Sequence, residues 1–195
     1  MKSLVKKSLI LMPVMLLSLT ACGKLSEDQA KERINGYSLA NVSEKYASVD
    51  IKSECKVNKR TGVFAEDGLM GSVASMIIEA LTQDEKAADV SDGFFTADAI
   101  DVSGMEDEEG YETKIEYFSY KGNGLKVVST GSGDVSEEGI KEKVSAKSTV
   151  YVFDDGRMEK GDGSMKMSVS GSYMGLTLEG DLDLSFKVSY SWNKK

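Results

Sequence analysis

Histidine is absent from this 195-residue sequence, and proline and cysteine are nearly absent. Without histidine the chain lacks the commonest general base at neutral pH, and Ser-His and Cys-His nucleophile pairs are excluded. The single proline, Pro13, excludes a proline-rich linker between domains. A structural zinc site is disfavoured because the cysteines are only Cys22 and Cys55. We therefore predict a protein that is not an enzyme and that uses no cofactor and no metal.

The N-terminus has the pattern of an exported lipoprotein. A basic start is followed by an apolar run over residues 8–19, which is short for a bilayer span, and then by Leu19-Thr20-Ala21-Cys22-Gly23. These five residues resemble the lipobox of bacterial lipoproteins, in which the signal is cleaved before a cysteine that carries fatty acyl chains such as palmitate. We expect residues 1–21 to be a cleaved signal peptide, Cys22 to be lipidated, and residues 22–25 to be a short tether. The alternative is an ordinary secreted protein in which Cys22 is incidental.

The net charge restricts the partners. Loss of Lys2, Lys6 and Lys7 with the signal changes the formal charge from -8 to about -11. Such an acidic surface repels nucleic acid and anionic lipid headgroups, so we expect no nucleic-acid partner and membrane attachment through the lipid at Cys22. The expected location is extracytoplasmic, on the outer leaflet of the cell membrane. In a host with two membranes it would be the outer membrane, because Gly23 rather than aspartate follows the lipobox cysteine.

Strict alternation over residues 176–192 is the main structural signal. Every even position is apolar or glycine and every odd position is polar, from Leu176 to Trp192. Side chains of an extended chain point to opposite faces in turn, so this stretch is predicted to be a strand or strand pair with one apolar face. The same alternation over residues 49–57 places Cys55 on the apolar side. With Cys22 lipidated, Cys55 has no disulfide partner and is expected to be a buried, inert thiol.

Turn signals divide the second half into hairpins. Gly122-Asn123-Gly124 should join residues 111–121 to 125–130, and Asp154-Asp155-Gly156 should join residues 144–153 to the next strand. We expect a turn-rich break over residues 131–139. Residues 84–110 contain ten acidic side chains and one lysine, so we expect a long, partly ordered acidic loop there.

Helical patterns occur in the first half. Ser26 and Gln29 form a capping-box pattern before a helix over about 27–35, and apolar residues recur at helical spacing over 68–83. The predicted fold class is α+β: a curved antiparallel sheet of about six strands, an unclosed half-barrel, with one or two helices packed on its concave face. Residues 26–195 should form a single domain.

Carboxylate groups are the remaining candidates for chemistry. The run Glu106 to Glu109 lies in the acidic loop, and no stretch fits the twelve-residue EF-hand pattern for calcium. Asp181 and Asp183 occupy the polar side of a strand. We interpret both groups as solvated surface charge rather than as metal or acid-base sites.

The order of elements resembles a known superfamily. The lipobox, the N-terminal helix, the strand over 49–57 and the late hairpins from Val150 to Trp192 are similar to bacterial lipoproteins related to LolA, LolB and the LppX/LprG group. This resemblance implies a strongly curved, unclosed sheet with helices on its concave face. In several members of that superfamily the cavity holds lipid.

The leading hypothesis is a lipoprotein that binds lipid or another apolar ligand in a cavity between sheet and helix. Methionine suits such a site because its flexible side chain adapts to variable apolar shapes. The expected lining residues are Met70, Val73, Ile77, Leu81, Met165, Met167, Leu182, Leu184 and Phe186. The alternative is that these side chains form a solid core, in which case the protein would be a surface or interaction lipoprotein with a protein partner and no ligand cavity.

Overall fold

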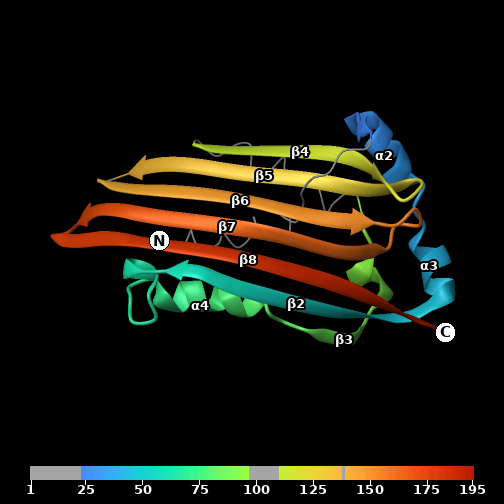
Figure 1. The fold of residues 1–195 in the computed structure, drawn as a ribbon, viewed down its shortest axis with the longest axis horizontal. Helices are drawn as coiled ribbons and strands as arrows, with labels where there is room; N and C mark the ends of the chain where they lie inside the picture. The colour runs from blue at the N-terminus through green and yellow to red at the C-terminus, as the bar shows by residue number, and fades with distance from the viewer. Residues whose placement is uncertain (1–22, 97–109, 138) are drawn as a thin grey trace.

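The computed structural model describes residues 23–96, 110–137 and 139–195. Within these ranges the chain forms one open, eight-stranded antiparallel sheet, three α-helices and two short 3-10 helices (Figure 1). The strands are β1 (Lys24–Leu25), β2 (Tyr46–Arg60), β3 (Glu85–Ala88), β4 (Tyr111–Tyr120), β5 (Gly124–Glu137), β6 (Ile140–Val152), β7 (Met158–Tyr173) and β8 (Leu176–Lys194). The helices are α2 (Glu27–Asn35), α3 (Leu39–Lys45), α4 (Gly71–Ala80), η1 (Gly62–Phe64) and η2 (Val90–Gly93).

The sheet is a meander with an earlier strand added to its last strand. Strands β4 to β8 pair in chain order, and β1 pairs with β4 at one edge. Strand β2 pairs with β8 along nearly its whole length, from Tyr46 opposite Lys194 to Arg60 opposite Leu182, and the four-residue β3 follows at the other edge. The N-terminal and C-terminal parts of the chain are therefore joined through the β2–β8 pair.

The alternation along β8 gives the sheet two different faces. Leu182, Leu184, Phe186 and Val188 are buried on one face, while the odd-numbered residues between them are half-buried or exposed on the other. We call these the apolar face and the polar face. Neighbouring strands keep this division because Met165 pairs with Leu184 and Ala146 pairs with Met165. Residues 176–192 were expected to be a strand or strand pair with one apolar face, and they form the single strand β8 with that face buried.

The helices lie toward the two ends of the sheet. Figure 1 shows α2 and α3 at the end where the C-terminus lies, and α4 nearer the opposite end beside β2 and β8. Helix α2 begins with the expected capping box, in which Ser26 Oγ accepts from the Gln29 amide at 3.2 Å and Gln29 Oε1 accepts from the Ser26 amide at 2.9 Å. Helix α4 is shorter than the predicted 68–83, because Met70 adopts a non-helical backbone before Gly71 and the helix stops at Ala80.

The α+β fold with an open antiparallel sheet is confirmed, but the prediction of about six strands is wrong. Edge strands β1 and β3 span two and four residues, and segments this short contain too few positions for alternation to be detected. Strand β3 and the turn η2 also lie within the segment that was expected to be an acidic loop. Residues 97–109 of that segment lie outside the described residues.

The predicted turn-rich break over 131–139 is also wrong for most of its length. Strand β5 continues to Glu137, with Gly131 opposite Thr113 and Gly133 opposite Tyr111. The Tyr111 ring lies over Gly133, where an added Cβ would come within 2.5 Å of the ring. Glycine is therefore required here by an aromatic ring that crosses from the neighbouring strand, and not by a turn.

Candidate functional site

Most of the predicted lining residues meet in one apolar cluster beneath α4, which we call the α4 cluster. The predicted residues buried in it are Ile77, Met165, Met167, Leu182 and Leu184, and those packed against it in part are Met70, Val73 and Leu81. Phe64 of η1 and Ala74 of α4 complete the contact and are fully buried. The structure thus brings the predicted helix residues and strand residues together on the apolar face.

Helix α4 is held in place by polar contacts to β2 as well as by apolar packing. Arg60, the last residue of β2, donates from Nε to the Phe64 carbonyl at 2.7 Å and from Nη2 to the Gly71 carbonyl at 2.8 Å. It also donates from Nη2 to Ser75 Oγ at 2.9 Å. One guanidinium therefore fixes η1 and the first turns of α4, since its planar donors fit several acceptors at once.

A second apolar cluster lies toward the α2 end of the sheet, and we call it the α2 cluster. It contains Ala30 and Ile34 of α2 and Phe95, together with residues of β4, β5 and β6. Leu125, Val127 and Val152 are fully buried in it. The apolar face is thus covered by two separate groups of side chains.

A row that contains two serines, a glycine and one aromatic residue separates the two clusters on the apolar face. It runs across four strands as Ser129, Ser148, Gly163 and Phe186, which are register neighbours, and we call it the serine strip. On β6, Ser148 lies between Ala146 of the α4 cluster and Val150 of the α2 cluster. Phe186 is the one predicted lining residue that belongs to the strip and not to the α4 cluster.

The floor of the strip is shaped by Gly163. A Cβ added there would come within 2.6 Å of Phe186 Cζ and 2.9 Å of Ser148 Cβ. The Phe186 ring therefore lies over Gly163 and reaches toward Ser148. A larger residue at position 163 would displace this ring.

The two serine hydroxyls are buried without the partners that buried polar groups normally have. Ser129 and Ser148 are each 0 % exposed, and neither Oγ has a hydrogen-bond partner among the described residues. Leaving a hydroxyl buried and unpaired costs about 1–3 kcal/mol, so two at one place call for an explanation. Sequence reasoning missed them, although serine at positions that alternate with Val127, Ala146 and Val150 is the signal that would have found them.

Cys55 lies at the far end of the same row, because it is the register partner of Phe186. Its thiol is half-buried against the α4 cluster, and burial raises its pKa above the usual value for a thiol. A raised pKa lowers the fraction of reactive thiolate. This agrees with the expectation of an inert cysteine.

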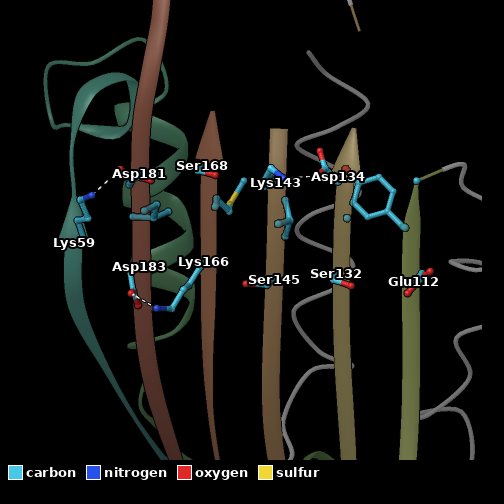
Figure 2. Close-up of a pocket in the computed structure, with 16 residues that line it drawn as sticks. Lys59, Glu112, Ser132, Asp134, Lys143, Ser145, Lys166, Ser168, Asp181 and Asp183 are labelled. Carbon is cyan, nitrogen blue, oxygen red and sulfur yellow. Dashed lines mark hydrogen bonds and ion pairs between the residues drawn. The ribbon is translucent and has the colours of Figure 1, made fainter. Parts of the chain in front are cut away.

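A different hollow occurs on the polar face, with a volume of about 930 Å³. Figure 2 shows its charged residues and serines projecting from β2 and from β4 to β8. Lys59 pairs with Asp181 at 2.7 Å, Lys166 pairs with Asp183 at 2.9 Å, and Lys143 pairs with Asp134. Hydrogen bonds from Lys166 and then Asn58 hold the pKa of Asp183 below its usual range, so this carboxylate is a paired anion and not an acid-base group. Asp181 and Asp183 thus agree with their interpretation as surface charge.

Cys22, the predicted lipidation site, and the acidic run Glu106 to Glu109 lie outside the described residues. Within the described ranges, no group of three or more potential ligands is arranged to hold a metal ion. No helix in the described part of the chain is long and apolar enough to cross a membrane. Comparisons with protein-family models, curated proteins and solved structures found no match to this chain.

Proposed function

We propose that this protein is an exported, lipid-anchored and non-enzymatic lipoprotein that binds an apolar ligand, such as a lipid acyl chain, on the apolar face of its sheet. The observation that carries the proposal is the serine strip, where glycine and serine interrupt an otherwise apolar face between two clusters. Protein interiors are filled to crystal-like density, and a solid core would place larger apolar side chains at positions 129 and 148. Apolar walls with a few polar groups are typical of ligand sites.

In this proposal α4 covers one side of the ligand. The helix presents Ile77 and Ala74 to the sheet and leaves Met76 facing outward, with 50 % of Met76 exposed. Binding would be driven by removal of apolar surface from water, at about 25 cal/mol per Å². The lipid at Cys22 would keep the domain at the membrane that supplies the ligand, because two or more acyl chains anchor a protein stably.

Photolabelling of the processed protein tests this function. The full chain is produced in a bacterium that processes lipoproteins, and the product is reconstituted into phosphatidylcholine vesicles that contain a phosphatidylcholine with a diazirine on its acyl chain. After irradiation, the labelled peptides are mapped by mass spectrometry. We expect label on the apolar-face residues of β6, β7 and β8, and label restricted to the tether next to Cys22 would contradict the proposal.

A charge beneath α4 should block the site. Ile77 is 1 % exposed, so Ile77→Asp would place a carboxylate against the apolar face, where both the helix and an apolar ligand would be repelled. We expect labelling of β7 and β8 to fall about tenfold or more, while strand content measured by circular dichroism is retained because the sheet and the α2 cluster do not depend on Ile77.

Met76→Asp is the matched control, because it places the same charge on the outward side of the same helix. Its labelling should equal that of the wild type. Undiminished labelling in Ile77→Asp would show that α4 does not cover the ligand. Equal loss in both variants would point to general damage to the helix.

A second candidate is a solid-cored interaction lipoprotein. It is favoured by the complete burial of Phe64, Ala74 and Leu184 in the α4 cluster and by an exposed apolar tip between β7 and β8. At this tip Met174 is 86 % exposed, and Tyr173 and Leu176 are also exposed. Exposed apolar patches often mark interaction sites. In the photolabelling experiment, label on this tip without label on the apolar face would support the second candidate.

A further inference from the structure

We propose that Ser129 and Ser148 bind the carbonyl oxygen of an acyl ester, so that the ligand is an ester-linked lipid and not a hydrocarbon or an ether lipid. This inference rests on the proposed function and adds the chemical group that the site recognises. It starts from the two hydroxyls, which are fully buried and have no hydrogen-bond partner within the described ranges.

The two hydroxyls are placed to act together. Ser129 and Ser148 are direct register partners on the neighbouring strands β5 and β6, and both belong to the apolar face. The Cα atoms of such antiparallel partners are about 4.5–5.5 Å apart, which is close enough for both hydroxyls to donate to one acceptor oxygen between them. A carbonyl oxygen has two lone pairs and can accept both hydrogen bonds.

The surroundings select for a carbonyl with an apolar chain attached. Val127 and Val150 lie on one side of the pair along the strands, and Ala146 lies on the other side with Met165 beside it. Within the serine strip, Gly163 has no side chain beside Ser148, and the Phe186 ring that lies over Gly163 forms the apolar wall on that side. Among the buried residues of the described ranges the one charged side chain is Lys126, which lies on the polar face of β5, so a neutral ester fits the serine pair better than a carboxylate or a phosphate.

The test compares two photoactivatable phosphatidylcholines that have the same headgroup and chain length. One carries its chains through ester bonds and the other through ether bonds, so they differ in the carbonyl groups. The processed full chain is reconstituted into vesicles of unlabelled ether lipid with a trace of either probe. Labelling of the β6 and β7 peptides is then measured by mass spectrometry for the wild type and for two double variants.

The first double variant is Ser129→Ala with Ser148→Ala, which removes both hydroxyls. The second is Ser132→Ala with Ser145→Ala, a register pair on the same two strands whose side chains are exposed on the polar face. We expect the wild type and the second variant to label with the ester probe about tenfold more than with the ether probe, as two neutral hydrogen bonds would give. The first variant should label equally with both probes, at the level of the ether probe.

The other outcomes separate the two proposals. If the wild type labels equally with both probes, the carbonyl-binding role is overturned and the apolar site stands. If neither probe labels β6 and β7 in the wild type, the proposed function itself is overturned. If both double variants lose the ester preference, the effect does not come from the buried pair and the role of Ser129 and Ser148 is again overturned. Thermal unfolding checks that the first variant is folded, and we expect it to be at least as stable as the wild type.

Discussion

At the scale of single residues, Lys126 is the clearest departure from ordinary burial. It lies on the polar face of β5 and is 2 % exposed, and its Nζ has no hydrogen-bond partner among the described residues. The ammonium group lies 5.6 Å from the centre of the Phe118 ring and 5.8 Å from that of Tyr151. Burial lowers the pKa of Lys126, and the nearby Asp162 opposes this shift only in part. The electron-rich faces of these two rings therefore stabilise the ammonium group in place of hydrogen bonds.

This environment predicts how stability depends on pH. Because the pKa of Lys126 is lower in the folded state, the unfolded chain holds a proton that the folded chain releases, and stability rises with pH between the folded and the unfolded pKa. At neutral pH we expect Lys126→Met to equal the wild type in stability or to exceed it by up to about 1 kcal/mol. The stability of this variant should not rise with pH in the way that the stability of the wild type does. Urea unfolding from about pH 7 to pH 10 measures both effects.

The exposed Lys141 of β6 provides the control, and Lys141→Met should keep the pH dependence of the wild type. Burial also raises the pKa of Tyr117 and of Tyr190 to about 12, and their titration lowers stability at high pH. That contribution is shared by all three proteins and cancels in the comparison. Parallel pH profiles for the wild type and Lys126→Met would contradict the prediction.

At the scale of elements, the two-residue strand β1 is notable because it lies within residues 22–25, the segment expected to be a tether. Lys24 and Leu25 pair with Phe118 and Tyr117 of β4, and the Ser119 amide donates to the Gly23 carbonyl at 3.1 Å. Lys24 Nζ also contacts Glu116 Oε1 at 2.6 Å. Pairing with β4 thus extends to Gly23, next to the residue expected to carry the lipid.

The ion pair predicts an acid-sensitive attachment of β1. Hydrogen bonds from Lys24 and then Lys114 hold the pKa of Glu116 below its usual range, so the stabilisation is present at neutral pH and is lost as the pH falls through the folded pKa. Because Lys24 is largely exposed, the pair contributes about 0.5 kcal/mol. We expect Glu116→Gln to speed hydrogen exchange at the Ser119 amide about twofold at neutral pH.

After correction for the intrinsic exchange rate, lowering the pH should speed exchange at the Ser119 amide about twofold in the wild type. It should have no further effect on this amide in Glu116→Gln. Glu112→Gln alters an exposed carboxylate at the other end of β4 and should leave the Ser119 amide unchanged. Slow exchange at Ser119 in Glu116→Gln would mean that backbone pairing alone holds β1.

A long alternating strand and a helix with a capping box can be predicted from the sequence. Very short strands, and features that depend on how two strands pair, cannot. The ladder of β8 and the capping box of α2 are encoded locally, so residues 176–192 and 26–35 were identified correctly. Strands β1 and β3 exist only through their partners, and Gly133 resembles a turn residue until Tyr111 is seen to cover it. The apolar set beneath α4 followed from periodicity, whereas the Ser129–Ser148 pair depends on register between two strands, which the alternation of one strand does not specify.

At the scale of the whole molecule, the topology separates local pairing from long-range pairing. Strands β4 to β8 are joined by hairpins, and each can pair with the strand just before it. Strand β2 must instead find β8, the last of the described strands. Contacts between distant segments form late because closing the longer loop costs more entropy.

This separation predicts an order of folding. In pulsed hydrogen exchange during refolding, amides of the β5–β6 pair should gain protection first, and those of β2 should gain it together with β8. The β4–β5 pair serves as the comparison in the same experiment, because it is also a local hairpin, joined by the short turn after Tyr120. Protection of β2 before β8 would contradict the prediction, because β3 alone offers β2 only a few backbone partners.

The pairing of β2 with β8 also has a consequence for biosynthesis. A chain made from its N-terminus presents β2 early, but the strand that completes the sheet beside it is the last to leave the ribosome or an export channel. Until residues 176–194 arrive, the edge of β2 that pairs with β8 has no strand beside it. For the exported protein that we propose, this order of strands would delay folding until the whole sheet has crossed the membrane.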